Sequence, residues 1–491
     1  MDNITSDKLP KRAKISFAVG QIGESAIYLI FMLYFVFFLT DIVGFDPAFA
    51  GLVSMVGVLW DAITDPVVGT ISDNAKFKSG RRSPFVLGFA VPFSVSAALL
   101  FTMFDLGPIA LKAYFIIAII VFFSFYTLWY VPFIALSAEM TQDYDERTSL
   151  HTYRGIGMTV GALLGAIVPL LLVEMFVGMD VVKSSAWSFA GWILGAITAL
   201  TFLICWAGTR GMDLDMSKRT ENSSRFSFFG RYAVVFANRP FRFICAITAF
   251  TLLGHTFDGA IFMYYCKYYM GLTNDTISAV LAIAPFSGLI YAPFVGIMAQ
   301  RFGKKIAFIG LIGAGALFHA LMFFLQPGNL YLFCTLITLS SIGTIAFWVL
   351  IGSMNSDVIE VDEWTSGERR EGLYFGFFAM TQKIGAALSM GFLGIFLSAI
   401  GYVANAEQTA STVFGLRIGY TLIGVIPILI ATIVCIFYPI TGKKHNVLRQ
   451  ALAAKAAGEP HSTKGFEDLI PKKLQHPSKA TCHQGSTREQ L

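Results

Sequence analysis

Twelve apolar runs, each long enough to cross a bilayer, occupy most of this 491-residue chain. They lie near residues 15–40, 47–71, 84–104, 112–139, 152–174, 187–208, 241–269, 276–299, 306–326, 330–357, 372–400 and 416–439. A helix needs about 20 consecutive apolar residues to span the hydrocarbon core. Because lipid offers no hydrogen-bond partners to the backbone, each run must satisfy its own peptide groups by forming a helix. The sequence therefore predicts an all-α membrane protein with twelve transmembrane helices.

The composition excludes several functional classes. Only 14% of the residues are charged, against about 25% in soluble domains. From Thr441 onward, nine Lys and Arg stand against four Asp and Glu, so this tail alone supplies the net charge of +5. A basic tail beside a membrane favours contact with anionic lipid, and we expect no nucleic-acid partner. The chain has no HExxH, GxSxG or Walker motif, so we expect neither an enzyme nor a bound cofactor.

Lysine and arginine concentrate in alternate loops, which predicts the orientation. The basic loops fall at 8–14, 76–82, 210–231, 301–305 and 443–444. Short cytoplasmic loops carry the excess of positive charge in membrane proteins. We therefore expect both termini in the cytoplasm and the protein in the plasma membrane (the inner membrane of a bacterium).

The chain divides into two halves at a long polar loop. We expect an N-terminal six-helix bundle over 1–208, a cytoplasmic central loop over 209–240, a C-terminal six-helix bundle over 241–440 and a basic, disordered tail over 441–491, with one short helix near 451–457. A weak repeat relates 69–82 to 296–305: a glycine, a polar residue four positions on, and then a glycine before two cations. Two ordinary basic loops would explain each segment alone. Their matching places favour the paired halves of an alternating-access transporter.

Two aspartates lie one helical turn apart in the second apolar run. Asp61 and Asp65 occupy positions i and i+4, so both carboxylates leave the same face of the helix. Each costs roughly 2.5–3.5 kcal/mol at the bilayer centre, which requires a partner or a function. Na⁺ is a hard ion that prefers oxygen ligands. The pair therefore predicts a cation site; a purely structural ion pair is the alternative.

A second polar pair lies in the seventh run. His255 and Asp258 occupy positions i and i+3, and an intramembrane pair of this kind indicates a proton relay or hydrogen bonds to substrate. A solvated position near the extracellular end is the alternative. His319 is alone in its apolar run and is interpreted as a core histidine.

Four stretches together resemble the glycoside–pentoside–hexuronide:cation symporter family of the major facilitator superfamily, whose familiar member is melibiose permease. They are 40–44, 60–66, 357–372 and 381–385, in order and at the matching spans. The resemblance covers about residues 17–438. It implies the major facilitator fold of two six-helix bundles, and symport of a sugar (a glycoside, pentoside or hexuronide) with Na⁺ or H⁺ by alternating access.

The resemblance also implies site residues. Asp61 and Asp65 match the carboxylates that bind the coupling cation, Na⁺ or H⁺, and Thr127 matches a hydroxyl that completes that site. Lys383 would supply compensating charge and border the substrate. A hydroxyl bonded to its own helix is the alternative for Thr127.

For the sugar, the resemblance implies contacts from Arg154 and from the aromatic ring of Trp348. A snorkelling arginine and a generic core tryptophan are the alternatives. Melibiose permease holds galactosyl hydroxyls with two aspartates, and this chain has Ser25 and Tyr130 at those positions. We therefore expect another sugar than a galactoside, with an acidic sugar as one option. Glu24 points about 100° away from Ser25 and is not interpreted as a replacement.

A second substrate class stays open at this point. Relatives of melibiose permease also move lysophospholipids, and Ser25 with Tyr130 makes the cavity less polar, which would suit an amphiphile. By analogy of fold alone, we expect a monomer.

Charged residues at the cytoplasmic ends of helices are interpreted as gates that bias one conformation over the other. They are Asp73 with Arg81 and Arg82, and Asp357, Asp362 and Glu363 with Arg369 and Arg370. Solvated loop charge is the alternative.

Overall fold

The computed structural model describes residues 8–75, 77, 80–141, 143–213, 235–368, 370–457, 459–460 and 462–470. Twelve helical segments of this described part are long and apolar enough to cross a membrane. Arg369 and most of the central loop lie outside the described residues. The prediction of twelve membrane-crossing helices is confirmed.

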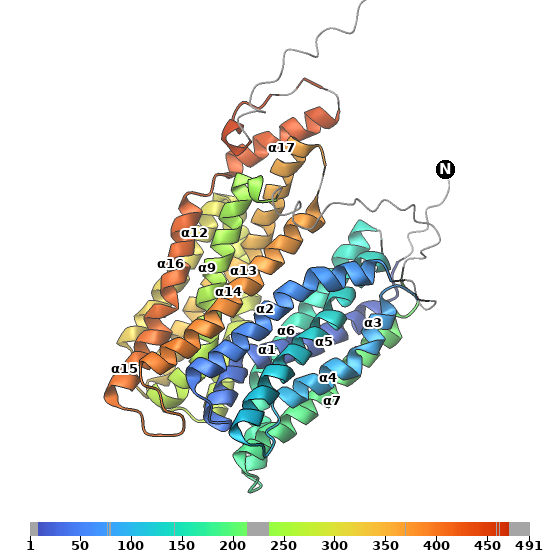
Figure 1. Cartoon of the computed structure of the whole chain (residues 1–491). Helices are drawn as coiled ribbons and strands as arrows, with labels where there is room; N and C mark the ends of the chain where they lie inside the picture. The colour runs from blue at the N-terminus through green and yellow to red at the C-terminus, as the bar shows by residue number, and fades with distance from the viewer. Residues whose placement is uncertain are drawn as a thin grey trace, which may run out of the picture.

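Six of these segments form an N-terminal bundle (Figure 1). Their elements are α1 (Lys11–Phe37) continued by the π-helix η1 (Phe38–Ile42), α2 (Pro47–Asp73), α3 (Ser83–Gly88) with α4 (Ala90–Leu100), α5 (Pro108–Met140), α6 (Tyr144–Val177) and α7 (Lys183–Thr209).

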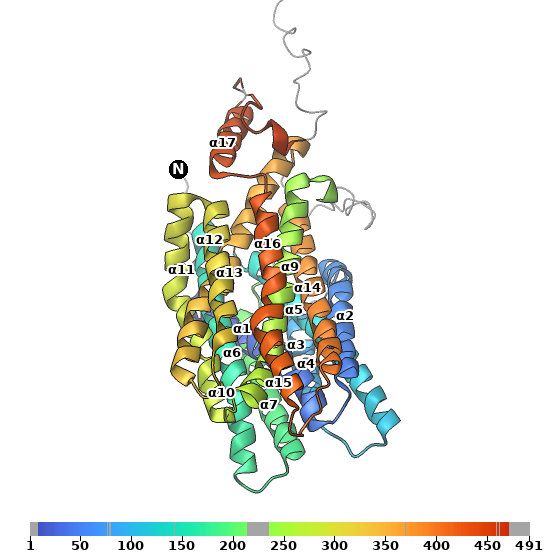
Figure 2. The same cartoon turned by 90° about the vertical axis from the view of Figure 1, so that its left-hand side faces the viewer.

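The other six form a C-terminal bundle, which faces the viewer in Figure 2. Its elements are α9 (Arg239–Tyr264) continued by the π-helix η3 (Tyr265–Tyr269), α10 (Asn274–Leu281) with α11 (Ile283–Phe302), α12 (Lys304–Leu321) with η4 (Met322–Phe324), α13 (Leu330–Ser366), α14 (Glu371–Ala399), and α15 (Ala410–Ile418) with η5 (Gly419–Ile423) and α16 (Val425–Ile436). The chain then forms α17 (Gly442–Ala456) and the short η6 (Glu467–Leu469).

Local signals explain where several helices begin and end. Asp46 caps α2, since its Oδ1 accepts hydrogen bonds from the backbone N–H groups of Ala48 and Phe49 at 3.0 and 3.2 Å, and Pro47 suits the first helical position. Gly367 ends α13 with φ of 74°, a conformation that favours glycine. The expected end of this span at residue 357 was nine residues short, because the helix continues through charged residues after its apolar part stops.

The tail begins with a helix, α17, that starts nine residues before the short helix expected near 451–457. Thr441 caps α17 by accepting a hydrogen bond from the Lys444 N–H. Leu448 is fully buried in the same apolar cluster as Phe466. The helix thus buries Leu448 against an apolar surface, a contact that composition alone does not reveal.

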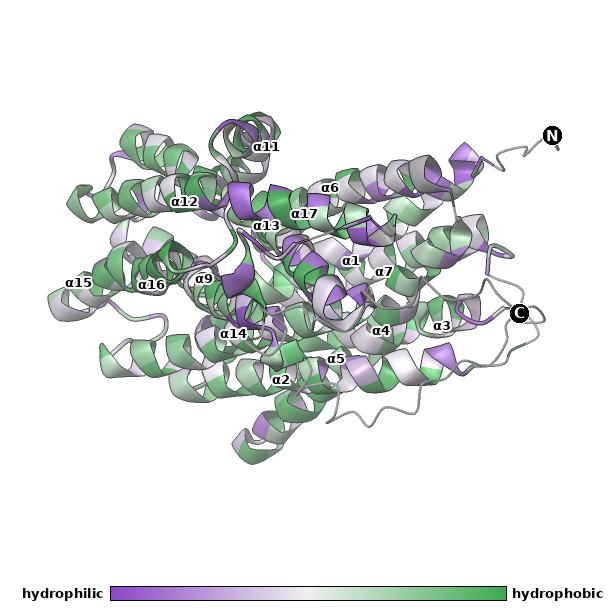
Figure 3. Cartoon of the chain, turned by 90° about the horizontal axis from the view of Figure 1, so that it is seen from above, coloured by the Kyte–Doolittle hydropathy of each residue, from purple (hydrophilic) through white to green (hydrophobic). Residues whose placement is uncertain are grey.

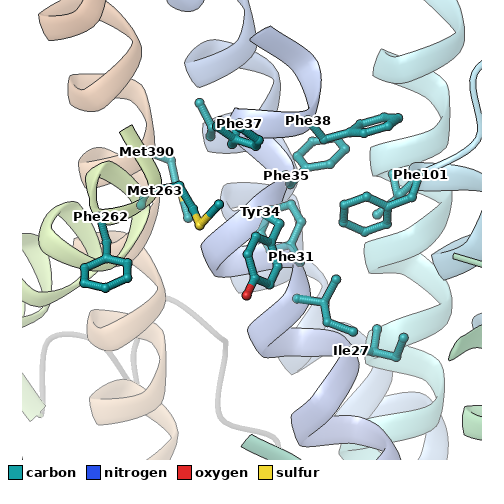
Figure 4. Packing of buried hydrophobic residues seen from close by; sticks show 14 of the residues in the cluster. Ile27, Phe31, Tyr34, Phe35, Phe37, Phe38, Phe101, Phe262, Met263 and Met390 are labelled. Carbon is teal, nitrogen blue, oxygen red and sulfur yellow. The ribbon is translucent and has the colours of Figure 1, made fainter. Parts of the chain in front are cut away.

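The two bundles meet through glycines on α2 and α14. A Cβ atom on Gly51 would lie 2.7 Å from Cα of Gly394, and one on Gly391 would lie 2.6 Å from the sulfur of Met55. Small residues let helices approach this closely. The buried aromatic cluster around Phe31 and Phe35 of α1 extends to Met390 of α14 and Met263 of α9 (Figure 4).

The bundles diverge toward the end of the molecule that carries α17 (Figure 1), which we call the α17 end. The opposite end, where η1 and η3 lie, is called the far end. Seen along the bundle, outward-facing ribbon is largely hydrophobic (Figure 3), as a lipid-exposed surface requires. The substrate and cation residues expected from the sequence come mostly from α1, α2, α5, α6 and α14.

Candidate functional site

Lys383 joins both aspartates of the second span. Its Nζ lies 2.6 Å from Asp61 Oδ2 and 2.5 Å from Asp65 Oδ2. The two carboxylates come from α2 and the ammonium from α14, so this contact crosses between the bundles. Asp61 is fully buried, and the side chain of Lys383 is 12% exposed.

A hydroxyl from a third helix completes the group. Thr127 of α5 donates a hydrogen bond to Asp61 Oδ1 at 2.8 Å, and its oxygen lies 3.1 Å from the hydroxyl of Thr64. Asp65 Oδ1 is buried and has no hydrogen-bond partner among the described residues. The structure therefore brings together all four residues expected at the cation site.

The charges of this group are unbalanced by one. Two carboxylates and one ammonium leave a formal charge of −1 on Asp61, Asp65 and Lys383. A bound monovalent cation would bring the total to zero. Oxygen atoms from carboxylates and hydroxyls are the ligands that Na⁺ accepts, so the donor set fits a hard monovalent cation.

Arg154 of α6 lies in the N-terminal bundle and faces α1. Its Nε donates a hydrogen bond to Gln21 Oε1 at 2.8 Å, and its Nη2 donates to the Tyr130 hydroxyl at 3.4 Å. The Gln21 amide donates in turn to the Ser25 hydroxyl at 2.8 Å. The structure thus places Arg154, Tyr130 and Ser25, three residues expected to contact substrate, in one polar network.

Glu24 belongs to this network, against the expectation that it points away. Its Oε1 accepts a hydrogen bond from the Tyr126 hydroxyl at 2.9 Å, and its Oε2 lies 3.1 Å from the Ser25 hydroxyl. Gln21 also donates to it. The reason is that the long Glu24 side chain reaches across to its neighbour's face, although its Cα is rotated by about 100°. The polar network therefore includes one carboxylate.

Tyr126 connects the two polar groups. Its ring stacks on Tyr130 at 5.1 Å, and Lys383 Nζ lies 5.6 Å from the ring centre. One aromatic side chain therefore contacts the cation group through Lys383 and the Arg154 network through Glu24. Sequence reasoning missed Gln21, Glu24 and Tyr126; a buried carboxylate within the first apolar run was the available signal.

The remaining substrate candidates lie apart from this network. Trp348 is 55% exposed, and its ring packs edge-on against Phe347 at 5.2 Å. The contacts of Arg154 and of the two aspartates do not include it. His255 and Asp258 face a separate cavity inside the C-terminal bundle. Both residues have intermediate exposure, and the side chain of Asp258 is 12% exposed, which favours an enclosed position over the solvated alternative.

The expected gate residues of the N-terminal half contact one another. Arg82 Nη2 lies 2.5 Å from Asp73 Oδ1, and Arg81 donates to the backbone carbonyl of Asp73 at 3.2 Å. Both arginines also pair with Glu139 of α5, which sequence reasoning missed. All these residues belong to one bundle, so the expected clamp does not bridge the halves in this conformation.

The C-terminal gate residues divide into two pairs. Arg370 binds Asp362 through two hydrogen bonds of 2.8 and 2.6 Å, and this contact raises the pKa of the Arg370 guanidinium. Asp357 instead pairs with Lys304 at 2.6 Å and approaches His445 of α17 at 3.4 Å. Asp357, which was expected to form a clamp together with Asp362, Glu363, Arg369 and Arg370, therefore contacts other residues in this conformation. It lies more than two helical turns from the end of α13, beside the start of α12.

Contacts between the bundles concentrate at the far end. Asp41 of η1 is fully buried and accepts hydrogen bonds from Lys267 at 2.8 Å, Tyr268 at 2.5 Å and Tyr402 at 2.7 Å. Thr40 lies 2.8 Å from the hydroxyl of Tyr264. We call Asp41, Lys267, Tyr268 and Tyr402 the far-end cluster; it ties the first span to the second half of the chain.

Known proteins with a similar sequence or structure agree with this architecture. A family model described as MFS/sugar transport protein covers residues 16–442. The chain belongs to this family. The resemblance to the glycoside–pentoside–hexuronide:cation symporters is confirmed, and with it the major facilitator fold and a transporter rather than an enzyme.

Individual relatives agree with that assignment. An uncharacterised symporter of Synechocystis is 28% identical, over 92% of this chain and 98% of the relative. An Escherichia coli protein proposed to import sulfoquinovose is 29% identical, over 90% of this chain and 93% of the relative. In structure, the chain is similar to an inward-facing bacterial homologue of the lysosomal transporter Spinster, with a TM-score of 0.65, 15% identity, and coverage of 90% of this chain and 98% of that one.

Proposed function

We propose that this transporter couples the movement of a sugar to that of Na⁺ or H⁺ by alternating access. One observation carries the proposal: Lys383 of the C-terminal bundle binds both Asp61 and Asp65 of the N-terminal bundle at 2.6 and 2.5 Å. A cation that takes over these carboxylates would release the ammonium. Cation binding would thereby change a contact between the two moving halves, as coupling requires.

The substrate is proposed to bind beside this group, at Arg154, Tyr130 and Glu24. The arginine fork and the carboxylate offer donors and acceptors that suit adjacent hydroxyl groups. Tyr126 lies between Glu24 and Lys383. A sugar at Glu24 would therefore alter the surroundings of Lys383, so each ligand would raise the affinity for the other.

The arrangement of contacts supports a conformation closed at the far end and open at the α17 end. The far-end cluster and the contact of Gly51 with Gly394 hold the halves together on one side. The charge pairs at the α17 end lie within single bundles. We propose that the α17 end is cytoplasmic, with the protein in the plasma membrane, because the basic loops predict that orientation.

The substrate class is proposed to be a sugar, neutral or acidic. Glu24 disfavours an anion near Ser25, while Arg154 favours one. The relative proposed to import sulfoquinovose supports an anionic sugar. Another relative is named for export of 2,3-dihydroxypropane-1-sulfonate, so the direction of flux must be measured rather than assumed.

Cation flux in proteoliposomes tests the proposal. Neutral glycosides, uronates, sugar sulfonates and lysophospholipids are added outside or loaded inside, and Na⁺ or H⁺ movement is recorded. We expect a sugar to drive cation flux in the wild type, and Asp61→Asn to retain sugar binding but lose the coupled flux. Coupled flux that persists in Asp61→Asn would refute the cation site. A response to lysophospholipid alone would refute the substrate class.

A further inference from the structure

A second polar cluster lies within the C-terminal bundle, apart from the site above. A cavity of about 210 Å³ is walled by α9, α10, α11, α12, α13, η5 and α16. Most of its lining is apolar, and three titratable side chains face it: His255 and Asp258 of α9 and His319 of α12. The cavity is large enough for several water molecules, and its polar groups offer them partners.

Among the described residues that line the cavity, Asp258 has no basic neighbour of fixed charge. Its Oδ2 lies 3.8 Å from His319 Nε2, and its Oδ1 is buried with no hydrogen-bond partner among the described residues. No lysine or arginine occurs among the described residues that line the cavity. An ionised carboxylate is costly at such a position without a cation beside it.

The surrounding structure preserves room for this carboxylate. A Cβ atom on Gly424, which follows η5, would collide with Asp258 Oδ1. Only glycine at position 424 therefore lets the side chain lie where it does. If residue 258 only filled space, an apolar side chain of similar volume would do so at a lower free-energy cost than a carboxylate.

His319 is held in one orientation beside the carboxylate. Its Nε2 donates to the backbone carbonyl of Tyr420 at 2.8 Å, because a carbonyl oxygen only accepts. Tyr420 belongs to the π-helix η5, an irregularity common at functional sites. His319 was interpreted as a core histidine with its hydrogen bonds satisfied, and it does form this bond. That interpretation did not include the neighbouring Asp258.

His255 presents the third titratable group. Its Nδ1 lies 3.4 Å from the Thr344 hydroxyl of α13, and its Nε2 is buried with no hydrogen-bond partner among the described residues. The other polar lining residue of α13 is Ser340, which does not titrate near neutral pH. The groups able to exchange a proton here are therefore His255, Asp258 and His319, with the Tyr420 phenol beside them.

We infer that His255, Asp258 and His319 form a proton-binding site in the C-terminal bundle, separate from the cation group at Asp61 and Asp65. Uptake of one proton neutralises the Asp258 carboxylate, and its release restores the charge next to the imidazoles. Leu33 of α1 forms part of the cavity wall, and a Cβ on Gly259 would lie 3.6 Å from it. The site thus adjoins the surface along which the two bundles move, where a change of charge can bias one conformation.

Infrared difference spectroscopy tests this inference without any substrate. Purified full-length protein in lipid is taken through a pH step, in Na⁺-free buffer, and protonated carboxyl bands are recorded. We expect one titrating band that is lost in Asp258→Asn and kept in Asp61→Asn and in Asp275→Asn, an exposed carboxylate of α10. His319→Gln should keep the band and shift the pH at which it titrates.

The alternatives give distinct results. A difference spectrum of Asp258→Asn that superimposes on the wild type would overturn the proposal, as would a midpoint unchanged by His319→Gln. If Asp258→Asn does not fold, the His319→Gln comparison still decides. A titrating band that is lost in Asp61→Asn and kept in Asp258→Asn would assign the carboxyl to the proposed cation site and would overturn this inference.

Discussion

Removing the charge of Lys383 should make the stability of the protein depend on Na⁺. In Lys383→Met the stem keeps its length and apolar packing, but Asp61 and Asp65 lose the ammonium at 2.6 and 2.5 Å. At an effective dielectric constant of 20, each of these pairs carries a gross attraction of about 6 kcal/mol. Desolvation cancels much of that attraction, and breaking a buried pair from one side costs about 3–5 kcal/mol net. We expect the variant to lose a free energy of unfolding in that range when no cation can bind.

Na⁺ should restore much of this loss. A ligand that binds only the folded state at 100 times its Kd adds about 2.7 kcal/mol to stability. Unfolding is followed by tryptophan fluorescence in detergent, in Na⁺ and in choline at equal ionic strength. We expect Na⁺ to stabilise Lys383→Met more than the wild type. Without the ammonium, the group formed by Asp61, Asp65 and residue 383 bears a formal charge of −2 rather than −1.

A surface lysine provides the matched control. Lys444 pairs with Asp468 at 2.6 Å, but their side chains are 33% and 47% exposed. Exposed pairs contribute about 0–1 kcal/mol, so Lys444→Met should change little in either salt. If Lys383→Met were as stable as the wild type in choline and indifferent to Na⁺, the reasoning about a cation site at Asp61 and Asp65 would be refuted.

Three further predictions follow from other contacts. Arg154→Lys should weaken sugar binding by about 1–3 kcal/mol, because lysine cannot keep the hydrogen bonds to both Gln21 and Tyr130. Isothermal calorimetry would measure the affinity, and an unchanged affinity would contradict the proposed sugar contact. Asp41→Asn should loosen the far end, since the buried carboxylate accepts three hydrogen bonds from the C-terminal bundle. Cysteine-accessibility labelling should show more reaction at that end, and an unaltered pattern would argue against a gate. Gly394→Val should destabilise the protein or block transport, because even a Cβ at this position would lie 2.4 Å from the backbone carbonyl oxygen of Pro47. Normal flux together with normal thermal stability would show that the two bundles need not approach so closely.

The two aspartates of the cation group could be predicted because their signal is local. Asp61 and Asp65 share a helix face through their spacing alone, and charge within an apolar run is rare enough to be informative. The partners from α14 and α5 required the family resemblance. No local rule relates Lys383 to aspartates 318 and 322 positions away, or Thr127 to aspartates 62 and 66 positions away. Glu24 was misjudged for a different reason: helical geometry fixes the direction of a Cα–Cβ bond but not the reach of a long side chain.

The charged residues interpreted as gates lie at the ends of helices, and their role in closing that end stays a prediction. Asp73 and Arg82 do form an ion pair, yet within one bundle. Sequence marks where opposite charges accumulate, whereas the conformation decides whether they bridge two bodies. The far-end cluster escaped prediction because Asp41 and Lys267 are ordinary loop-proximal charges until the folded chain brings η1 and η3 together.

The sequence by itself determined the twelve spans, the two halves and the all-α class, because the bilayer requires each apolar run of sufficient length to be helical. Only the tertiary structure decided which polar groups meet inside the membrane. Lys383 reaches Asp61 and Asp65, Glu24 joins Arg154's network through Gln21, and His319 lies beside Asp258. These pairings depend on how whole helices pack, with glycines setting the distances between them, and helix packing is a property of surfaces assembled from the entire chain.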